Sequence, residues 1–286
     1  MSAGADESEV ARLAPGLTLA LPRVPHRGRV GEVRASSAGA SLELHDFRTY
    51  QPGDDLRQVD WNAVARTGEM ILRVRQDEVS PRVEVLVDAS RSVALSPTKE
   101  ARAREVALLA VEVGALQGLT PTLLTSGARP ERAQGAVCRS ALRASAFDAR
   151  DDLAAALGRM PPLRPCGLRV VVSDFLFEAD LAGLVARLSR GASALFLAQV
   201  LDAEDLEPSG GEGARLVDAE SGAALEELLT EDVLAAYARR FAEHQRALRT
   251  AAVRARATLM TLPAAESLRA LVRGPLRPLF LAGGGA

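Results

Sequence analysis

Short apolar runs alternate with helically spaced segments along this chain. Residues 82–88 (RVEVLVD), 168–173 (LRVVVS) and 194–201 (ALFLAQVL) are almost continuously apolar, as is typical of strands buried on both faces. Further strands are predicted at 121–125, 214–218 and 258–262, and helices at 96–117, 151–159, 181–188, 231–256 and 266–272. This alternation predicts an α/β fold with a doubly wound, mostly parallel sheet covered by helices on both faces.

The pattern divides the chain into four parts. Residues 1–34 are rich in Ala, Gly, Pro and Arg without periodicity and predict a flexible N-terminal arm. Residues 35–81 predict an N-terminal β-containing segment, with strands at 41–50 and 69–75 and a short helix that begins at Asp54. Residues 82–274 form the α/β domain, with a Gly- and acid-rich excursion at about 202–230, and residues 275–286 form a C-terminal tail.

The composition excludes several functions. Lys99 is the only lysine of the chain and lies outside any glycine-rich phosphate loop, so the chain is not itself a P-loop nucleotidase. A pI near 6.0 and 3% aromatic residues argue against binding to nucleic acid. Cys138 and Cys166 have no metal-ligand spacing, the N-terminus is acidic, and no apolar run reaches membrane-spanning length. We therefore expect a cytoplasmic protein without direct membrane insertion.

The motif Asp88-Ala89-Ser90-Arg91-Ser92 directly follows a predicted buried strand. One carboxylate and two hydroxyls at alternate positions offer three hard oxygen ligands, which suits Mg²⁺ or Ca²⁺. The alternative is a turn in which these side chains cap backbone amides. Asp88 follows the first strand of the predicted sheet, and Asp174 follows the fourth. These two strands flank the point at which a doubly wound sheet binds its ligand. Since two neighbouring carboxylates repel each other, a cation between them is expected.

A long signature precedes this motif. It runs from Tyr50 to Arg66 as YQPGDDLRQVDWNAVAR, and its marked positions are Tyr50, Pro52, Gly53, Asp54, Asp55, Arg57, Asp60, Trp61 and Arg66. With the two aspartate motifs, it resembles the domain of unknown function 58 family, a bacterial branch of the von Willebrand factor A-like proteins. The resemblance implies a metal-ion-dependent adhesion site in which Mg²⁺ keeps one position open for a partner's carboxylate.

The resemblance assigns the ligand roles residue by residue. Asp88, Ser90, Ser92 and Asp174 would bind the metal directly or through water. The family's usual threonine is replaced by Asp151, so that three carboxylates are expected to converge on one cation.

Two further features have a structural and a functional interpretation. Arg57 and Asp60 are three residues apart on the predicted short helix, and Trp61 would plug a salt-bridged clasp, so that Trp61→Ala should cost about 3 to 5 kcal/mol; the alternative is a docking surface. A helical stripe at Leu234, Tyr237, Phe241, His244 and Leu248 predicts packing on the chain's own domain rather than partner binding.

These features predict a metal-dependent protein-binding module. The resemblance adds the partner: the chain would be the adaptor or client-recognition subunit of a MoxR-like AAA+ ATPase in chaperone-type assembly, with a client protein as second partner. No catalytic constellation is found, because no histidine is placed to activate Ser90 or Ser92. The alternatives are a metal-dependent hydrolase and a structural subunit with a degenerate metal site.

Overall fold

A computed structural model describes residues 6–21, 45–50, 59–75, 82–208, 215–217, 224–226 and 230–282. The chain forms two compact units. Unit 1 comprises residues 1–24 and 81–286, and unit 2 comprises residues 25–80.

Unit 1 is built on a six-stranded sheet with the order β11-β8-β7-β4-β5-β6. All pairs are parallel except β5 with β6, which is antiparallel. The strands are β4 (Val83–Val87), β5 (Thr122–Thr125), β6 (Glu131–Gln134), β7 (Cys166–Ser173), β8 (Ala192–Leu201) and β11 (Thr258–Pro263). The prediction of a mostly parallel α/β sheet is therefore confirmed, and every residue of β4 and β7 is buried.

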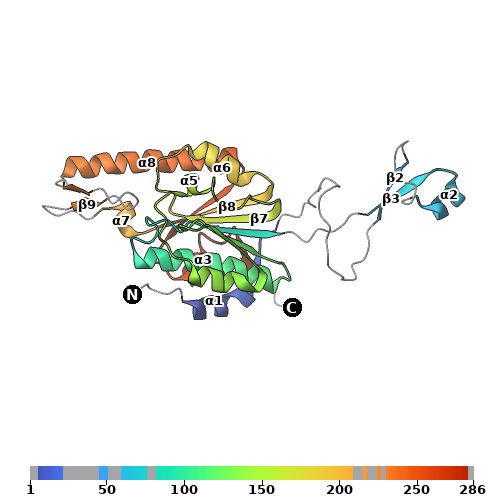
Figure 1. Ribbon diagram of the computed structural model, residues 1–286, viewed down its shortest axis with the longest axis horizontal. Helices are drawn as coiled ribbons and strands as arrows, with labels where there is room; N and C mark the ends of the chain where they lie inside the picture. Colours follow the sequence, from blue (N-terminus) through green and yellow to red (C-terminus); the bar gives the residue numbers. More distant parts are fainter. Residues whose placement is uncertain are drawn as a thin grey trace. The chain divides into compact units, whose positions relative to one another are not determined.

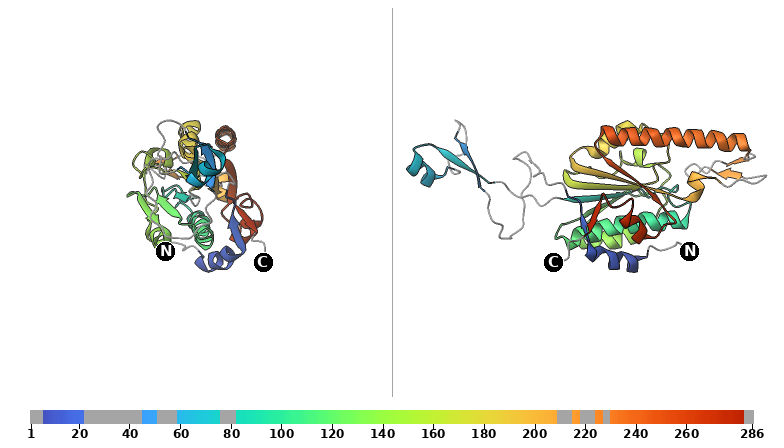
Figure 2. Two further views of the ribbon diagram at one scale, coloured as in Figure 1. Left: turned by 90° about the vertical axis from the view of Figure 1, so that its right-hand side faces the viewer. Right: turned by 180° about the vertical axis from the view of Figure 1, so that it is seen from behind.

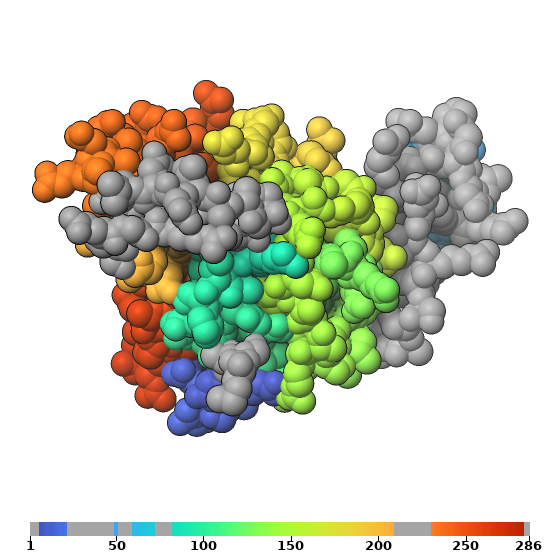
Figure 3. All heavy atoms as spheres, turned by 60° about the vertical axis from the view of Figure 1, so that its left-hand side comes forward, coloured from blue at the N-terminus to red at the C-terminus, as the bar shows by residue number. Residues whose placement is uncertain are grey.

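Helices cover both faces of this sheet. On one face α1 (Glu7–Leu13), α3 (Pro97–Leu116) and α9 (Leu268–Arg273) enclose one apolar cluster, and on the other α5 (Leu153–Ala156), α6 (Leu181–Ser189) and α8 (Glu231–Arg254) enclose a second. Figures 1 and 2 show these layers from the front and from behind. In the space-filling view of Figure 3, α8 (orange) and the blue α1 lie at opposite sides of unit 1.

Helix α3 begins where the sequence predicts. Ser96 accepts a hydrogen bond from the Lys99 amide at 3.4 Å, and Pro97 occupies the first turn. The helix is followed by Gly118 with a φ of 74°, a conformation that glycine adopts without strain. This start places Lys99 in the first turn of α3, at the end of the sheet where β4 ends.

Both ends of the chain depart from prediction. Residues 6–21 are not a flexible arm, because Val10, Ala14 and Leu19 are buried in the cluster beneath α3. The expected C-terminal tail is likewise packed as far as residue 282, with Leu276, Leu279 and Phe280 buried. Strand β1 (Leu17–Leu19) pairs antiparallel with β12 (Phe280–Ala282), so these two segments form a small two-stranded sheet together. Their apolar residues lack a regular period, which is why the pattern did not reveal them.

Smaller differences surround the sheet. Strand β6 and helix α4 (Cys138–Ala144) were not predicted, and the helix expected at 151–159 is only the single turn of α5. The excursion after β8 contains α7 (Ala203–Leu206) and the antiparallel pair β9 (Arg215–Val217) and β10 (Ala224–Glu226).

Unit 2 contains β2 (His45–Thr49) and β3 (Ile71–Arg75), which pair antiparallel as predicted strands, and α2 (Trp61–Thr67). The helix begins later than predicted: Asp60, not Asp54, is its N-cap, and accepts hydrogen bonds from the Asn62 and Ala63 amides. Val59 forms a β-bridge, which excludes it from the helix. Trp61 has 59% of its surface exposed, so the prediction of a buried aromatic plug is wrong.

Candidate cation site

The site lies at the carboxyl ends of β4 and β7. These strands are parallel neighbours, with Val87 opposite Val172. The chain leaves β4 toward β5 on one side and leaves β7 toward β8 on the other, so the order of the sheet reverses between them. A doubly wound sheet opens a crevice at such a point. Asp88 and Asp174, each the residue after its strand, are fully buried there.

The loop after β4 is held by hydrogen bonds to Asp88. Its Oδ1 accepts from the Ser90 amide and from Ser126 Oγ, both at 3.1 Å, and its Oδ2 accepts from Ser173 Oγ at 2.6 Å. The hydroxyls of Ser90 and Ser92 lie 2.9 Å apart, Ser90 buried and Ser92 half-buried. The loop thus presents two hydroxyl oxygens side by side, next to a buried carboxylate.

Asp88 is the electrostatically unusual member of the site. Burial, followed by the nearby Asp174 carboxylate, raises the pKa of Asp88 to about 6, although the hydroxyl and amide donors oppose the shift. Within the described residues, no lysine or arginine forms an ion pair with Asp88. Its charge is therefore met by neutral donors alone.

The turn that carries Asp174 is fixed from three directions. Gln199 Nε2 donates to the Asp174 carbonyl at 3.0 Å, and the Phe175 amide donates to Ser173 Oγ at 2.9 Å. His244 Nε2 lies 2.6 Å from the Phe175 carbonyl, which gives this histidine a structural contact rather than a ligand role. Phe175 has a φ of 54°, a conformation that costs a side-chain-bearing residue energy and is held by such surroundings.

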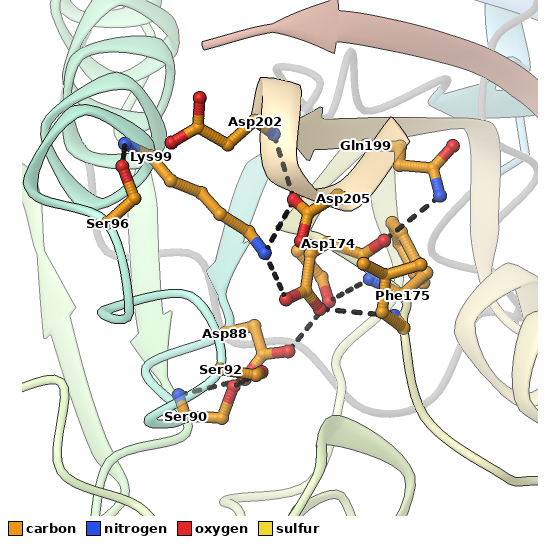
Figure 4. Close-up of polar contacts among 12 residues, drawn as sticks. Asp88, Ser90, Ser92, Ser96, Lys99, Asp174, Phe175, Gln199, Asp202 and Asp205 are labelled. Atoms are coloured by element: carbon orange, nitrogen blue, oxygen red, sulfur yellow. Dashed lines mark hydrogen bonds and ion pairs between the residues drawn. The ribbon is translucent and has the colours of Figure 1, made fainter. Parts of the chain in front are cut away.

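Lys99 provides the charge that faces Asp174. Its Nζ lies 2.8 Å from Asp174 Oδ2 and 2.9 Å from Asp205 Oδ2, and the lysine side chain is 2% exposed. Figure 4 shows Lys99 reaching from α3 to both carboxylates, with the Ser90–Ser92 pair beside Asp88. Burial lowers the pKa of Lys99, but the carboxylates of Asp174 and Asp205 outweigh it, and the net shift is upward. The ammonium is therefore charged.

Asp151 does not join the site. Its carboxylate forms an ion pair with Arg159 and its side chain is 43% exposed. The neighbouring backbone does follow the loop after β4, since Ala149 forms a bridge with Ser90 and accepts a hydrogen bond from the Arg91 amide at 3.0 Å. Asp152 then caps α5 and the chain turns away. The expected convergence of three carboxylates is wrong, because no group of three His, Cys, Asp or Glu side chains among the described residues could hold a metal ion.

The remaining ligand set still fits a hard cation. Asp88, Ser90, Ser92 and Asp174 come from two adjacent strand ends and supply only oxygen atoms. Such donors suit Mg²⁺ or Ca²⁺. The Asp88 carboxylate has no ion-pair partner among the described residues, so its charge would favour a cation at this point.

The signature residues of unit 2 form no comparable cluster in the part of unit 2 that the structure describes. The Tyr50 amide donates to the Met70 carbonyl at 2.8 Å, Asp60 caps α2, and Arg66 Nε donates to the Asn62 carbonyl at 3.3 Å. The predictions for Pro52, Gly53, Asp54, Asp55 and Arg57 lie outside the described residues.

The sequence profile described as "Protein of unknown function DUF58" matches residues 46–247. The chain belongs to this family. The DUF58 match spans β2 through most of α8 and so includes Asp88, Ser90, Ser92, Lys99, Asp174 and Asp205.

Relatives and solved structures add context. The "Uncharacterized protein Rv1480" of Mycobacterium tuberculosis and the "Uncharacterized protein Mb1516" of Mycobacterium bovis are each 28% identical over 223 residues, covering 72% of this chain and 70% of the relative. The conserved hypothetical protein BatB from Bacteroides thetaiotaomicron has a TM-score of 0.39 at 11% identity, over 69% of this chain and 98% of that one. An aerotolerance-related membrane protein from Bacteroides fragilis has a TM-score of 0.34 at 12% identity, over 70% and 98%. Both TM-scores are too low to establish a common fold.

None of the described helices has both the length and the hydropathy that a bilayer crossing requires.

Lys99 and Asp205 were not predicted as site residues. A solitary lysine in an arginine-rich chain was a usable signal for Lys99. Asp205 lies in the irregular excursion and carried none.

Proposed function

We propose that this DUF58 protein is a metal-dependent protein-binding module of von Willebrand factor A-like architecture. Asp88, Ser90, Ser92 and Asp174 would hold Mg²⁺ or Ca²⁺, and a cation there would supply an attachment point for an acidic side chain of a partner. The observation that carries the proposal is the buried Asp88 carboxylate, which has only neutral donors around it. A buried charge without a counterion is costly, and a cation removes that cost.

The charges of the site agree with a divalent ion. Three carboxylates, those of Asp88, Asp174 and Asp205, face one ammonium, that of Lys99. Lys99 contacts two of them and leaves Asp88 unpaired. With every group ionised, these four side chains carry a net charge of about −2, which one divalent cation would neutralise.

The hydroxyl pair favours binding over catalysis. Ser92 is half-buried, so the pair is reachable from solvent. The base beside the pair is Asp88, whose carboxylate also accepts hydrogen bonds from Ser126 and Ser173. His244, the histidine described in unit 1, contacts the Phe175 carbonyl. A hydrolase would need an activated nucleophile or water, and no histidine contacts the pair among the described residues.

The partner follows from the family resemblance. We infer that the module works with a MoxR-like AAA+ ATPase, which would supply the energy while this chain recognises or presents a client protein. The chain has no means of its own to bind nucleotide phosphates through lysine, because Lys99 is committed to two carboxylates. Lys99 also favours one alternative, a structural subunit in which the ammonium replaces the metal.

Cation binding separates these possibilities. Isothermal titration of the metal-free protein with Mg²⁺ and Ca²⁺ should give one site, and a saturating cation should raise the Tm by linkage. Asp88→Asn should abolish that response and should itself stabilise the metal-free protein, since it removes a buried charge. Asp151→Asn is the matched control and should bind the cation as the wild type does. Equal responses from both variants would place the cation elsewhere, and no response from the wild type would favour the structural subunit.

Partner binding needs its own comparison. Affinity for a MoxR-like ATPase from the same genome should require a divalent cation and should fall at least about tenfold in Ser90→Ala/Ser92→Ala. Ser140→Ala/Ser189→Ala is the control, since these hydroxyls donate only to carbonyls three residues earlier in the chain. A folded Ser90→Ala/Ser92→Ala protein with undiminished affinity would rule out the loop as the contact.

A further inference from the structure

A cavity lies at the opposite end of the same strands, beside the amino ends of β7 and β8. It has a volume of about 260 Å³ and is lined by Leu157, Pro161, Pro162, Leu163, Arg187 and Arg190. One wall is the loop between α5 and β7, and the other is the end of α6. The lining is thus an apolar surface with two guanidinium groups.

The two walls are joined by a buried arginine. Arg169 is fully buried in β7, and its guanidinium donates to the carbonyls of Leu188, Arg190 and Arg164. The first two carbonyls belong to the α6 wall and the third to the loop wall. Glu84 balances its charge, with Oε2 2.7 Å from Arg169 Nε. The cavity is therefore built on a hydrogen-bonded frame centred on Arg169.

A second arginine lies behind the loop wall with part of its hydrogen-bonding capacity unused. Arg132 donates to the Pro162 carbonyl through Nη2, which also lies 3.8 Å from Glu84 Oε1. Its Nε and Nη1 are buried and have no hydrogen-bond partner. Burial, and then the charge of Arg164, lowers the pKa of Arg132. Positive charge is therefore in excess here, since among the described residues Glu84 is the only acid that forms an ion pair with Arg132 or Arg169.

The two arginines that line the cavity, and Arg164 next to its loop wall, are also free to bind. Across the described residues, the side chains of Arg164, Arg187 and Arg190 form no ion pair or hydrogen bond, and all three residues are exposed. Because guanidinium groups bind oxyanions through paired N–H donors, such a cluster around a cavity favours an anion over solvent alone.

We propose that this cavity binds the phosphate group of a small phosphate monoester, with Arg187 and Arg190 contacting the phosphate and the Leu and Pro side chains contacting the organic part. A phosphate carries about −1.5 to −2 charge and three acceptor oxygens, which matches several arginines better than one carboxylate does. The volume lies just below the range of drug-sized ligand sites, so the ligand is small.

Phenyl phosphate is a suitable probe, because it joins a phosphate to an apolar ring. Isothermal titration in EDTA, which removes any contribution of the cation site, should show saturable binding that weakens as salt increases. Inorganic phosphate should bind more weakly, since it lacks the apolar contact, and benzoate should bind more weakly because it carries one charge.

The matched variants test the location. Arg187→Gln/Arg190→Gln should weaken phenyl phosphate binding at least about tenfold, whereas Arg239→Gln/Arg240→Gln, two exposed arginines of α8, should leave it unchanged. Both pairs change the net charge equally, so nonspecific attraction would affect them alike. The proposal is overturned if phenyl phosphate does not bind, if both variants lose affinity equally, or if benzoate binds as tightly as phenyl phosphate.

Discussion

The two ends of β4 and β7 bury charge in opposite ways. At the amino end Glu84 has a dedicated partner in Arg169, whose three guanidinium nitrogens all donate hydrogen bonds, and further arginines surround the pair. At the carboxyl end Lys99 pairs with the buried Asp174 and with Asp205, while the buried Asp88 is left with neutral donors. The carboxyl end therefore has an unpaired negative charge, which suits a cation. The amino end has an excess of positive charge, which suits an anion.

Removing the central arginine should have the largest effect on this comparison. Arg169→Met would leave the buried Glu84 with Arg132 at 3.8 Å and the Arg164 amide at 3.5 Å, and would deprive three carbonyls of their donor. We expect a loss of about 3 to 5 kcal/mol in the free energy of unfolding, measured with urea. Arg187→Met, at an exposed site, should lose less than about 0.5 kcal/mol. A loss below about 1 kcal/mol for Arg169→Met would mean that the Arg169–Glu84 pair does not hold this end of the sheet together.

Removing the lysine should have the next largest effect. Lys99→Met would leave Asp174 buried without a cation and should cost about 3 kcal/mol in metal-free buffer. The cost should be smaller than at Arg169, because Asp205 is 18% exposed and can be solvated. The double variant Lys99→Met/Asp174→Asn should recover most of the loss. If the double variant is no more stable than Lys99→Met, the contribution of Lys99 is packing rather than charge.

The smallest effect is expected outside both ends, in unit 2. Trp61 is 59% exposed, so Trp61→Ala should change the free energy of unfolding by no more than about 0.5 kcal/mol. Thermal melting and urea titration both test this value. A loss of 3 kcal/mol or more, as a buried aromatic gives, would support the plug that the sequence suggested.

Much of the sheet could be predicted from the sequence, because β4, β7 and β8 are apolar on both faces and their flanking helices carry regular caps. The site was predictable to the same extent: strand ends are brought together by topology, so Asp88 and Asp174 were expected as neighbours. Asp151 was misplaced for a local reason. The direction of its side chain depends on where α5 begins, and the N-cap of α5 is Asp152, not Asp151.

Other residues were beyond sequence reasoning because their roles depend on distant contacts. The sequence around Lys99 argues against a phosphate loop and indicates nothing more, because no residue near it in the chain shows that Asp174 and Asp205 approach it. The arginine frame is similar, because Arg169 looks like a polar interruption of an apolar strand until Glu84 of β4 is seen beside it. Conversely, Trp61 was expected to be buried by residue type alone, and its position at the start of α2 exposes it.

The pairing of β1 with β12 sets an order for folding during synthesis. Thr18 and Leu281 are hydrogen-bonded across 263 positions of the chain, so β1 leaves the ribosome long before its partner strand exists. In that interval the apolar residues of β1 and α1 have only part of their final surroundings, and a loop this long is slow to close. The described elements of unit 2 all lie between residues 45 and 75 and need no such wait. The core beneath α3 is therefore among the last parts of the molecule to be completed.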